Sequence, residues 1–225
     1  MRRQTQPWLV KIGGSLLDWE GLASAWRKWS AERPAGVCFW LVAGGGAWVD
    51  SIRDQQARRG WSDREAHELA IDAMALTARV LAHRLALGCD NLLGESCSST
   101  ATTRDAFVGD RQSEPAISSD AGADRVVNVV PWLKRVESRA PGPKLPVGWS
   151  TTSDSIAARV AQQLGDLPLV LAKSCDPPGV DWRTWVETGY VDPSFALYGS
   201  GLSQMRAINF RAYGDISEPF SLGGG

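Results

Sequence analysis

The stretch Val10-Lys11-Ile12-Gly13-Gly14-Ser15 closes an apolar run that begins at Trp8. A second apolar run, Val37 to Ala43, leads directly into the triplet Gly44-Gly45-Gly46. Glycine has no Cβ, so the backbone N–H groups of such turns can approach a phosphate group closely. Lys11 adds a positive charge that can reach the phosphoryl oxygens. The two turns together therefore predict a site that binds phosphate.

Strand and helix patterns alternate outward from these two turns. The apolar runs predict strands at Trp8–Ile12, Val37–Ala43, Val126–Val130, Pro168–Ala172 and near Ala207–Ala212. Helical spacing predicts helices at 15–33, at 47–58, at 62–87 behind a Ser62–Glu65 capping box, and from 150–154 to Gly165. This order is typical of an α/β fold whose parallel strands are joined by crossover helices. The polar segment 94–124 is expected to form hairpins or loops.

Composition excludes several classes of protein. A net charge of −1 gives no basic surface for nucleic acid and no polybasic membrane patch. No apolar run approaches the roughly 20 residues that span a bilayer, so we expect a cytoplasmic protein. The four cysteines are widely scattered and lack a histidine partner set, which argues against a metal site built on cysteine.

The chemically useful residues gather where predicted strands end. In open α/β sheets, ligands bind beyond the carboxyl ends of the strands. Lys173 and Ser174 follow a strand in the same way as the two glycine turns do. The chain contains no Walker sequence, and no G-x-G-x-x-G follows a strand. The phosphate site is therefore expected to be of another type.

Four segments in order resemble one known family. Val10 to Ser15 and Val42 to Gly46 look like the two glycine motifs of the amino acid kinase superfamily, which includes acetylglutamate, aspartate, uridylate and isopentenyl phosphate kinases. Thr152 to Ala158 resembles its third motif, and Leu169 to Ser174 resembles the strand leading to its nucleotide site. The resemblance implies a three-layer αβα sandwich with a mainly parallel central sheet. It also implies a single domain over 1–225, with an acceptor half at about 1–145 and a shortened nucleotide half at about 146–225.

The resemblance also implies roles for particular residues. It places Lys11 at the transferred phosphoryl group, Asp154 between the lysines that it orients, and Lys173 as the second cation. ATP is the expected donor, with Mg²⁺ carried by the nucleotide and no metal ligand from the protein. The remaining roles are phosphate or nucleotide binding by Gly13, Gly14, Ser15 and Ser174, and acceptor binding by Gly44, Gly45, Gly46, Arg53, His67, Ser153 and Asp192.

Several of these residues have a simpler reading. Asp154 suits the first turn of a helix, where a carboxylate interacts well with the helix dipole. Ser153 also suits a helix cap. His67 fits a hydrogen-bonded core histidine as well as an acceptor residue of the kind that isopentenyl phosphate kinases carry on this helix. Arg53 fits a surface arginine as well as a partner of an acceptor phosphate.

The far half departs from the family pattern, because no lysine follows Lys173. Either Lys173 supplies the second cation or the donor is bound in an altered way. In size, and in the segments 149–158 and 191–193, the chain looks most like the small kinases similar to the 5-(aminomethyl)furan-3-yl-methyl phosphate kinase of methanofuran biosynthesis, an enzyme of C1 metabolism. Such an enzyme converts a phosphomonoester into a diphosphate. Its acceptor carries a phosphate and an amine, for which His67 and Asp192 are the candidates.

Two other functions remain open from the sequence. One is acyl-phosphate formation on an amino-acid carboxylate, and the other is a non-catalytic nucleotide-binding module on the same fold. The missing distal lysine favours the second of these. The resemblance further implies a homo-oligomer, a dimer or higher, that associates through the helix after the second glycine turn.

Overall fold

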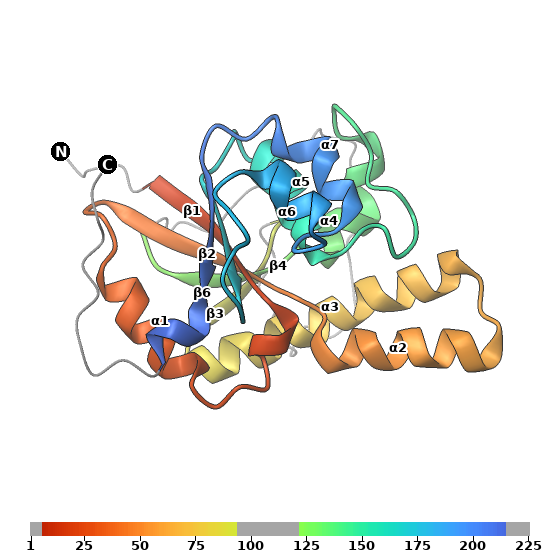
Figure 1. Cartoon of the computed structure of the whole chain (residues 1–225), viewed down its shortest axis with the longest axis horizontal. Coiled ribbons are helices and arrows are strands. Elements are labelled where there is room, and N and C mark those ends of the chain that lie inside the picture. Colours follow the sequence, from red (N-terminus) through yellow and green to blue (C-terminus); the bar gives the residue numbers. More distant parts are fainter. Residues whose placement is uncertain (1–5, 94–121, 215–225) are drawn as a thin grey trace, which may run out of the picture.

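The computed structural model describes residues 6–93 and 122–214, which form a six-stranded sheet with helices on both faces (Figure 1). The strand order is β3-β4-β2-β1-β5-β6, and every neighbouring pair is parallel. The strands are β1 Gln6–Ile12, β2 Val37–Ala43, β3 Gly88–Asn91, β4 Arg125–Asn128, β5 Leu169–Lys173 and β6 Met205–Asn209. The expected αβα sandwich with a parallel sheet is confirmed.

The helices of the described residues fall into long crossover helices and short connecting ones. The long helices are α1 Leu22–Ala31, α2 Gly46–Arg59, α3 Asp63–Leu85 and α5 Ser153–Gln163. The short ones are η1 Gly14–Leu16, α4 Val130–Arg135, η2 Glu137–Arg139, α6 Trp182–Glu187, η3 Pro193–Phe195, α7 Ala196–Gly199 and η4 Phe210–Tyr213. The capping box of Ser62 and Glu65 opens α3 as the sequence predicted.

Each central strand feeds two hydrophobic cores because successive side chains point to opposite faces of the sheet. Leu9 of β1 and Leu171 of β5 pack with α5 and the short helices around it. Val10 and Ile12 of β1 pack instead with α1 and the C-terminal half of α3. A strand that is apolar at every position is thus buried on both sides, as parallel sheets require.

Two local predictions differ from the structure. A helix over 15–33 was expected, but η1 ends at Leu16 and α1 begins only at Leu22. The Arg84 guanidinium donates to the carbonyl oxygens of Leu17 and Trp19, which holds the intervening turn in place. The strand expected at Val126–Val130 ends at Asn128, because α4 begins at Val130 and Pro131 occupies its first turn, where a missing N–H costs nothing.

The last strand and the connecting helices also differ from the sequence reading. β6 begins at Met205 and ends at Asn209, earlier than the expected 207–212. The helices α6 and α7 were not predicted, since each is too short to show a clear period. Most of the polar segment 94–124 lies outside the described residues.

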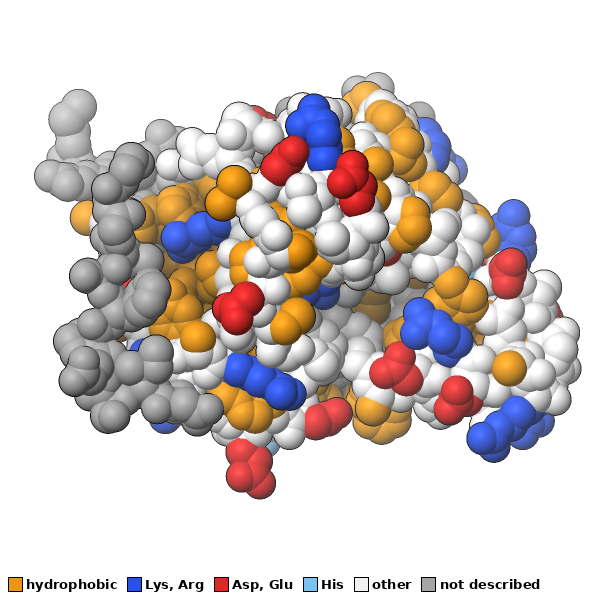
Figure 2. All heavy atoms as spheres, in the orientation of Figure 1, with side chains coloured by type: hydrophobic (Ala, Val, Ile, Leu, Met, Phe, Trp, Pro, Cys, Tyr) orange, Lys and Arg blue, Asp and Glu red, His pale blue; other side chains and the backbone are white. Residues whose placement is uncertain are grey.

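Helices α2 and α3 form an antiparallel hairpin that extends beyond the sheet (Figure 1). No residue of α2 is buried, so this helix has no hydrophobic core of its own. It is held by its contacts with α3 and η1. Acidic and basic side chains are interspersed on the face shown in Figure 2. Among the described residues, no helix combines the length and apolar character needed to cross a membrane.

Candidate active site

The two glycine turns contact each other directly, backbone against backbone. A Cβ on Gly14 would lie 2.3 Å from the nitrogen of Gly46, and a Cβ on Gly44 would lie 2.6 Å from the nitrogen of Gly14. Gly46 also has a φ of +55°, a conformation that side chains disfavour. The glycines are therefore needed to pack the ends of β1 and β2 together, a reason that the sequence reading did not include.

A buried carboxylate lies between two lysines at the ends of neighbouring strands. Lys11 Nζ is 2.6 Å from Asp154 Oδ1, and Lys173 Nζ is 2.7 Å from Asp154 Oδ2. The Lys11 contact is poorly aligned for a hydrogen bond, so charge rather than a directed bond holds that pair. The structure thus brings together the three residues that the sequence singled out as catalytic, from β1, α5 and β5.

Burial and charge act in opposite directions on this cluster. Burial would raise the pKa of the Asp154 carboxyl, but the ammonium groups of Lys11 and Lys173 outweigh it and hold that pKa below its ordinary value. Burial lowers the pKa of Lys173, and the charge of Lys11 lowers it further, against the opposing effect of Asp154. Two ammonium groups and one carboxylate leave a net charge of +1, which suits an anionic ligand.

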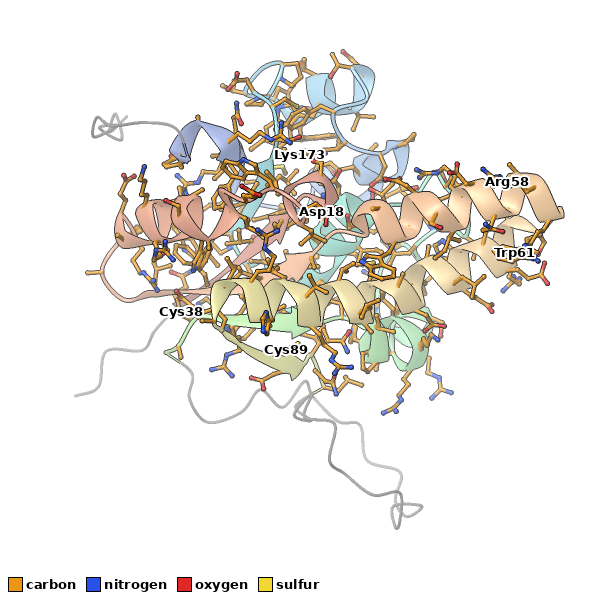
Figure 3. All side chains as sticks on the ribbon, turned by 90° about the horizontal axis from the view of Figure 1, so that it is seen from below. Asp18, Cys38, Arg58, Trp61, Cys89 and Lys173 are labelled. Carbon is orange, nitrogen blue, oxygen red and sulfur yellow. The ribbon has the colours of Figure 1, made fainter. Side chains whose placement is uncertain are left out.

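Lys173 has further partners that keep it at this position. Its Nζ donates to the carbonyl oxygen of Tyr190 and lies 4.7 Å from the centre of the Tyr190 ring. Next to it, the Ser15 hydroxyl donates to the Ser174 hydroxyl at 3.0 Å. The first glycine turn and the end of β5 are therefore linked directly. Lys173 is labelled in Figure 3.

Asp192 occupies a different place from the one expected. Its carboxylate accepts hydrogen bonds from the Thr152 hydroxyl at 2.7 Å and from the Ser155 backbone N–H at 3.1 Å, and also from the Ser155 hydroxyl. It therefore satisfies the N-terminus of α5, and it does not line the cavity described next. Thr152 is the N-cap residue of α5, and its hydroxyl accepts a hydrogen bond from the Asp154 backbone N–H. The Asp154 side chain does not serve as this cap and pairs with the two lysines.

A cavity of about 210 Å³ opens beside the glycine turns. One end is polar, with the Gly14, Ser15, Gly45 and Gly46 backbone and with Ser153 at the start of α5. The rest is formed by α2, α3 and the segment before α5, through Val49, Asp50, Arg53, His67, Ala70, Ile71, Met74, Trp149, Thr151, Thr152 and Ile156. Of the expected acceptor residues, Gly44 and Asp192 do not line it.

His67 lies on the wall of this cavity and also on the wall of a second, adjoining one of about 530 Å³. Burial lowers the pKa of its imidazole, against the opposing effects of a hydrogen bond to the Gly148 backbone and the charge of Glu68. The imidazole is therefore neutral near pH 7 and offers hydrogen bonds rather than a charge. Arg53 supplies positive charge to the cavity.

Sequence reasoning did not find Trp149, Met74 or Ile71 as cavity residues. Each has the character of an ordinary core residue, and only the folded structure shows that it faces a cavity. Within residues 6–93 and 122–214, no group of three or more His, Cys, Asp or Glu side chains could hold a metal ion.

Comparison with known proteins agrees with this geometry. The profile of the amino acid kinase family matches residues 6–177. The chain belongs to the amino acid kinase family. Its fold is also similar to the crystal structure of UMP kinase from Bacillus anthracis, with a TM-score of 0.53 and 15% identity over 93% of this chain and 89% of that chain. No curated protein sequence matched it.

The family places this kinase among the phosphotransferases, and the likeness to UMP kinase supports the fold alone. None of these comparisons matches the chain to a kinase of methanofuran biosynthesis. The chemistry of the acceptor is therefore inferred from the residues that line the cavity.

The lowered pKa of Lys173 leads to a prediction about pH. A lysine whose pKa is lowered loses its charge as pH rises, before an ordinary lysine does at about 10.4. We therefore expect kcat to fall as pH rises, and to do so at a pH below about 10.4. In Lys173→Arg the guanidinium stays charged, so the fall should disappear from the kcat–pH profile. The same alkaline fall in both proteins would show that Lys173 is not the group responsible.

Proposed function

We propose that this chain is an ATP-dependent kinase that phosphorylates a small phosphomonoester to a diphosphate. The observation that carries the proposal is the pair of lysines on Asp154 at the carboxyl ends of β1 and β5. Their neighbours in the chain, Gly14 and Ser153, line the polar end of the 210 Å³ cavity. Phosphoryl transfer needs aligned oxygens and neutralised charge more than covalent chemistry from the protein. The two lysines can neutralise charge on the phosphoryl group and align its oxygens.

The residues of the site divide the work between donor and acceptor. When bound, ATP supplies the phosphoryl group, and its Mg²⁺ neutralises charge on the phosphates. Lys11 and Lys173 stabilise the negative charge that develops on the transferred group, and Asp154 keeps the two ammonium groups aimed at it. In this proposal Gly13, Gly14, Ser15 and Ser174 hold the donor phosphates.

The acceptor side fits a small anion. The cavity is smaller than the roughly 300–1,000 Å³ of typical ligand sites, which suits the phosphate end of a small acceptor. Arg53 supplies a cation, and the amides of Gly45 and Gly46 and the Ser153 hydroxyl supply donors at the polar end. The apolar side chains of Ile71 and Met74 leave room for the body of the acceptor.

The first acceptor to test is 5-(aminomethyl)furan-3-yl-methyl phosphate, because the sequence most resembles kinases of that type. The assay would follow ADP release with this compound, with isopentenyl phosphate, with UMP and with acetylglutamate. Hydroxylamine would be added to trap any acyl phosphate. We expect turnover with a small phosphomonoester and no trapped product.

Two results would overturn this proposal. Turnover with a carboxylate, together with hydroxylamine trapping, would identify an acyl-phosphate-forming kinase. ATP binding without transfer to any acceptor would identify a non-catalytic nucleotide-binding module.

A further inference from the structure

Trp149 reaches from the segment before α5 to the hairpin of α2 and α3. Its indole Nε1 donates to Oε1 of Gln56, a residue 93 positions away in the sequence. The Gln56 amide nitrogen in turn donates to Asp63 Oδ1 at 2.7 Å and to the carbonyl oxygen of Trp61 at 3.3 Å. The indole is therefore anchored to the turn between α2 and α3, whose outer end carries the Trp61 label in Figure 3.

Arg53 is stacked on this anchored indole. It precedes Gln56 by three positions, so both side chains project from one side of α2. The guanidinium carbon of Arg53 lies 4.3 Å from the centre of the Trp149 ring, and its Nη1 lies 3.2 Å from Asp50. The Arg53 side chain is 48% exposed, and α2 buries no residue, so no hydrophobic core fixes this guanidinium.

A stacked guanidinium is well prepared to bind an anion. The stack uses the face of the group and leaves the N–H donors at its edge, where such donors match two oxygens of a phosphate. Of these donors, Nη1 also bonds Asp50. An arginine without such a contact loses much rotamer entropy when it binds. Arg53 and Trp149 both line the cavity next to the glycine turns, so the stacked edge lies on its wall.

We propose that Trp149, held by Gln56, is a positioning residue that fixes the Arg53 guanidinium in the acceptor cavity, where it binds the phosphate of the acceptor. The inference rests on the proposed function and adds the residues that select an anionic acceptor. Neither Trp149 nor Gln56 contacts the lysines on Asp154 in this arrangement. Their replacement should therefore change acceptor binding and leave donor binding unaltered.

The experiment measures steady-state kinetics of Trp149→Ala, Trp149→Phe, Gln56→Ala and Arg53→Ala with the phosphomonoester that the wild type uses. A cation–π contact contributes a factor of about 2 to 30 in affinity, so we expect Trp149→Ala to raise the acceptor KM about tenfold. The KM for ATP should not change. Trp149→Phe keeps an aromatic face and loses the N–H donor, so its acceptor KM should lie between those of the wild type and Trp149→Ala.

A double-mutant cycle separates positioning from packing. If Trp149 acts through Arg53, the double variant Arg53→Ala, Trp149→Ala should be no worse than Arg53→Ala alone. Additive effects, or equal changes in the KM values for ATP and acceptor, would overturn the proposal. Arg59→Ala, on the same helix but paired with Gln55, is the matched control and should behave as the wild type. Thermal unfolding of each variant checks that the fold is kept.

Binding of inorganic phosphate, measured by calorimetry, tests the inference without turnover. The wild type should bind phosphate, and Trp149→Ala and Arg53→Ala should bind it about tenfold more weakly. Equal binding by all three proteins, or no binding by the wild type, would overturn the inference. If the wild type binds phosphate in this way but transfers to no phosphomonoester, the proposed function alone has failed.

Discussion

Lys11→Met will remove phosphoryl transfer, with kcat about 10³-fold lower than in the wild type, while the protein stays folded. Removing one cation or donor from a charge-stabilising site costs 10² to 10⁵ in rate. The methionine keeps most of the side-chain volume at a position that is 4% exposed. Asp154 keeps Lys173 as a partner at 2.7 Å, so no buried carboxylate is left without a counter-charge.

The measurement is single-turnover transfer from labelled ATP, with urea unfolding in parallel. Lys28→Met, at an exposed position of α1, is the control and should retain full activity. Unchanged transfer in Lys11→Met would remove this lysine from the catalytic machinery. A large loss of stability with the loss of rate would mean that Lys11 serves mainly the fold.

Asp154→Asn should lower both activity and stability. An asparagine cannot balance two ammonium groups, so Lys11 and Lys173 would face each other in a buried place without an anion. Breaking a buried ion pair by removing one partner costs about 3–5 kcal/mol of unfolding free energy. We expect a loss of about this size and a fall in kcat of about 10²-fold, because the lysines lose their alignment.

The stability difference between Asp154→Asn and the wild type should depend on pH in a defined direction. The pKa of Asp154 is lowered in the folded protein, so its contribution is fully present above the ordinary carboxyl value of about 3.9. The contribution is lost as pH falls toward the lowered pKa, and the two proteins should become more alike. Urea unfolding from pH 7 downward measures this. A loss of stability with normal kcat would mean that Asp154 only supports the start of α5.

If Asp154 only interacted with the helix dipole, as its place in the first turn of a helix allows, this substitution would cost about 0.3–1 kcal/mol. The resemblance to the amino acid kinases implied that Asp154 orients the lysines. Burial could not be read from the motif, since the helix start at Thr152 and Ser153 looks solvent-exposed in sequence. The structure shows the carboxylate 4% exposed between two charges, and this changes the expected energy.

The fold was predictable where the physical signal is local. Apolar runs such as Val37–Ala43 are buried on both faces and end at glycine, and the strand bounds predicted from this run are correct. Parallel strands bring Lys11 and Lys173 to one edge of the sheet, so their proximity followed from the topology. Short helices such as α6 carry too few residues for a period to appear.

The acceptor cavity depended on contacts that sequence does not encode locally. Asp192 was expected there because an acid was needed, but three hydrogen bonds hold it at the start of α5. Trp149 looked like one of many tryptophans, and its role appears only when Gln56, 93 residues away, is seen to bind its indole. Long-range pairings of this kind need the folded chain.

The position of Lys173 matters because no lysine follows it in the sequence. Lys173 is held by Asp154 and by Tyr190, so it lies at the same edge of the sheet as Lys11. We propose that it acts as the second cation of the site. The alkaline fall in kcat predicted above tests this role.

We expect the lysines on Asp154 to promote transfer of a phosphoryl group from ATP to a phosphomonoester in the adjoining cavity. The most direct test is phosphorus NMR of the wild type with ATP, Mg²⁺ and 5-(aminomethyl)furan-3-yl-methyl phosphate. We predict loss of the acceptor monoester signal and growth of two coupled diphosphate signals at the rate of ADP formation, both absent with Lys11→Met. An unchanged monoester signal, with ATP bound or hydrolysed to free phosphate, would contradict the claim.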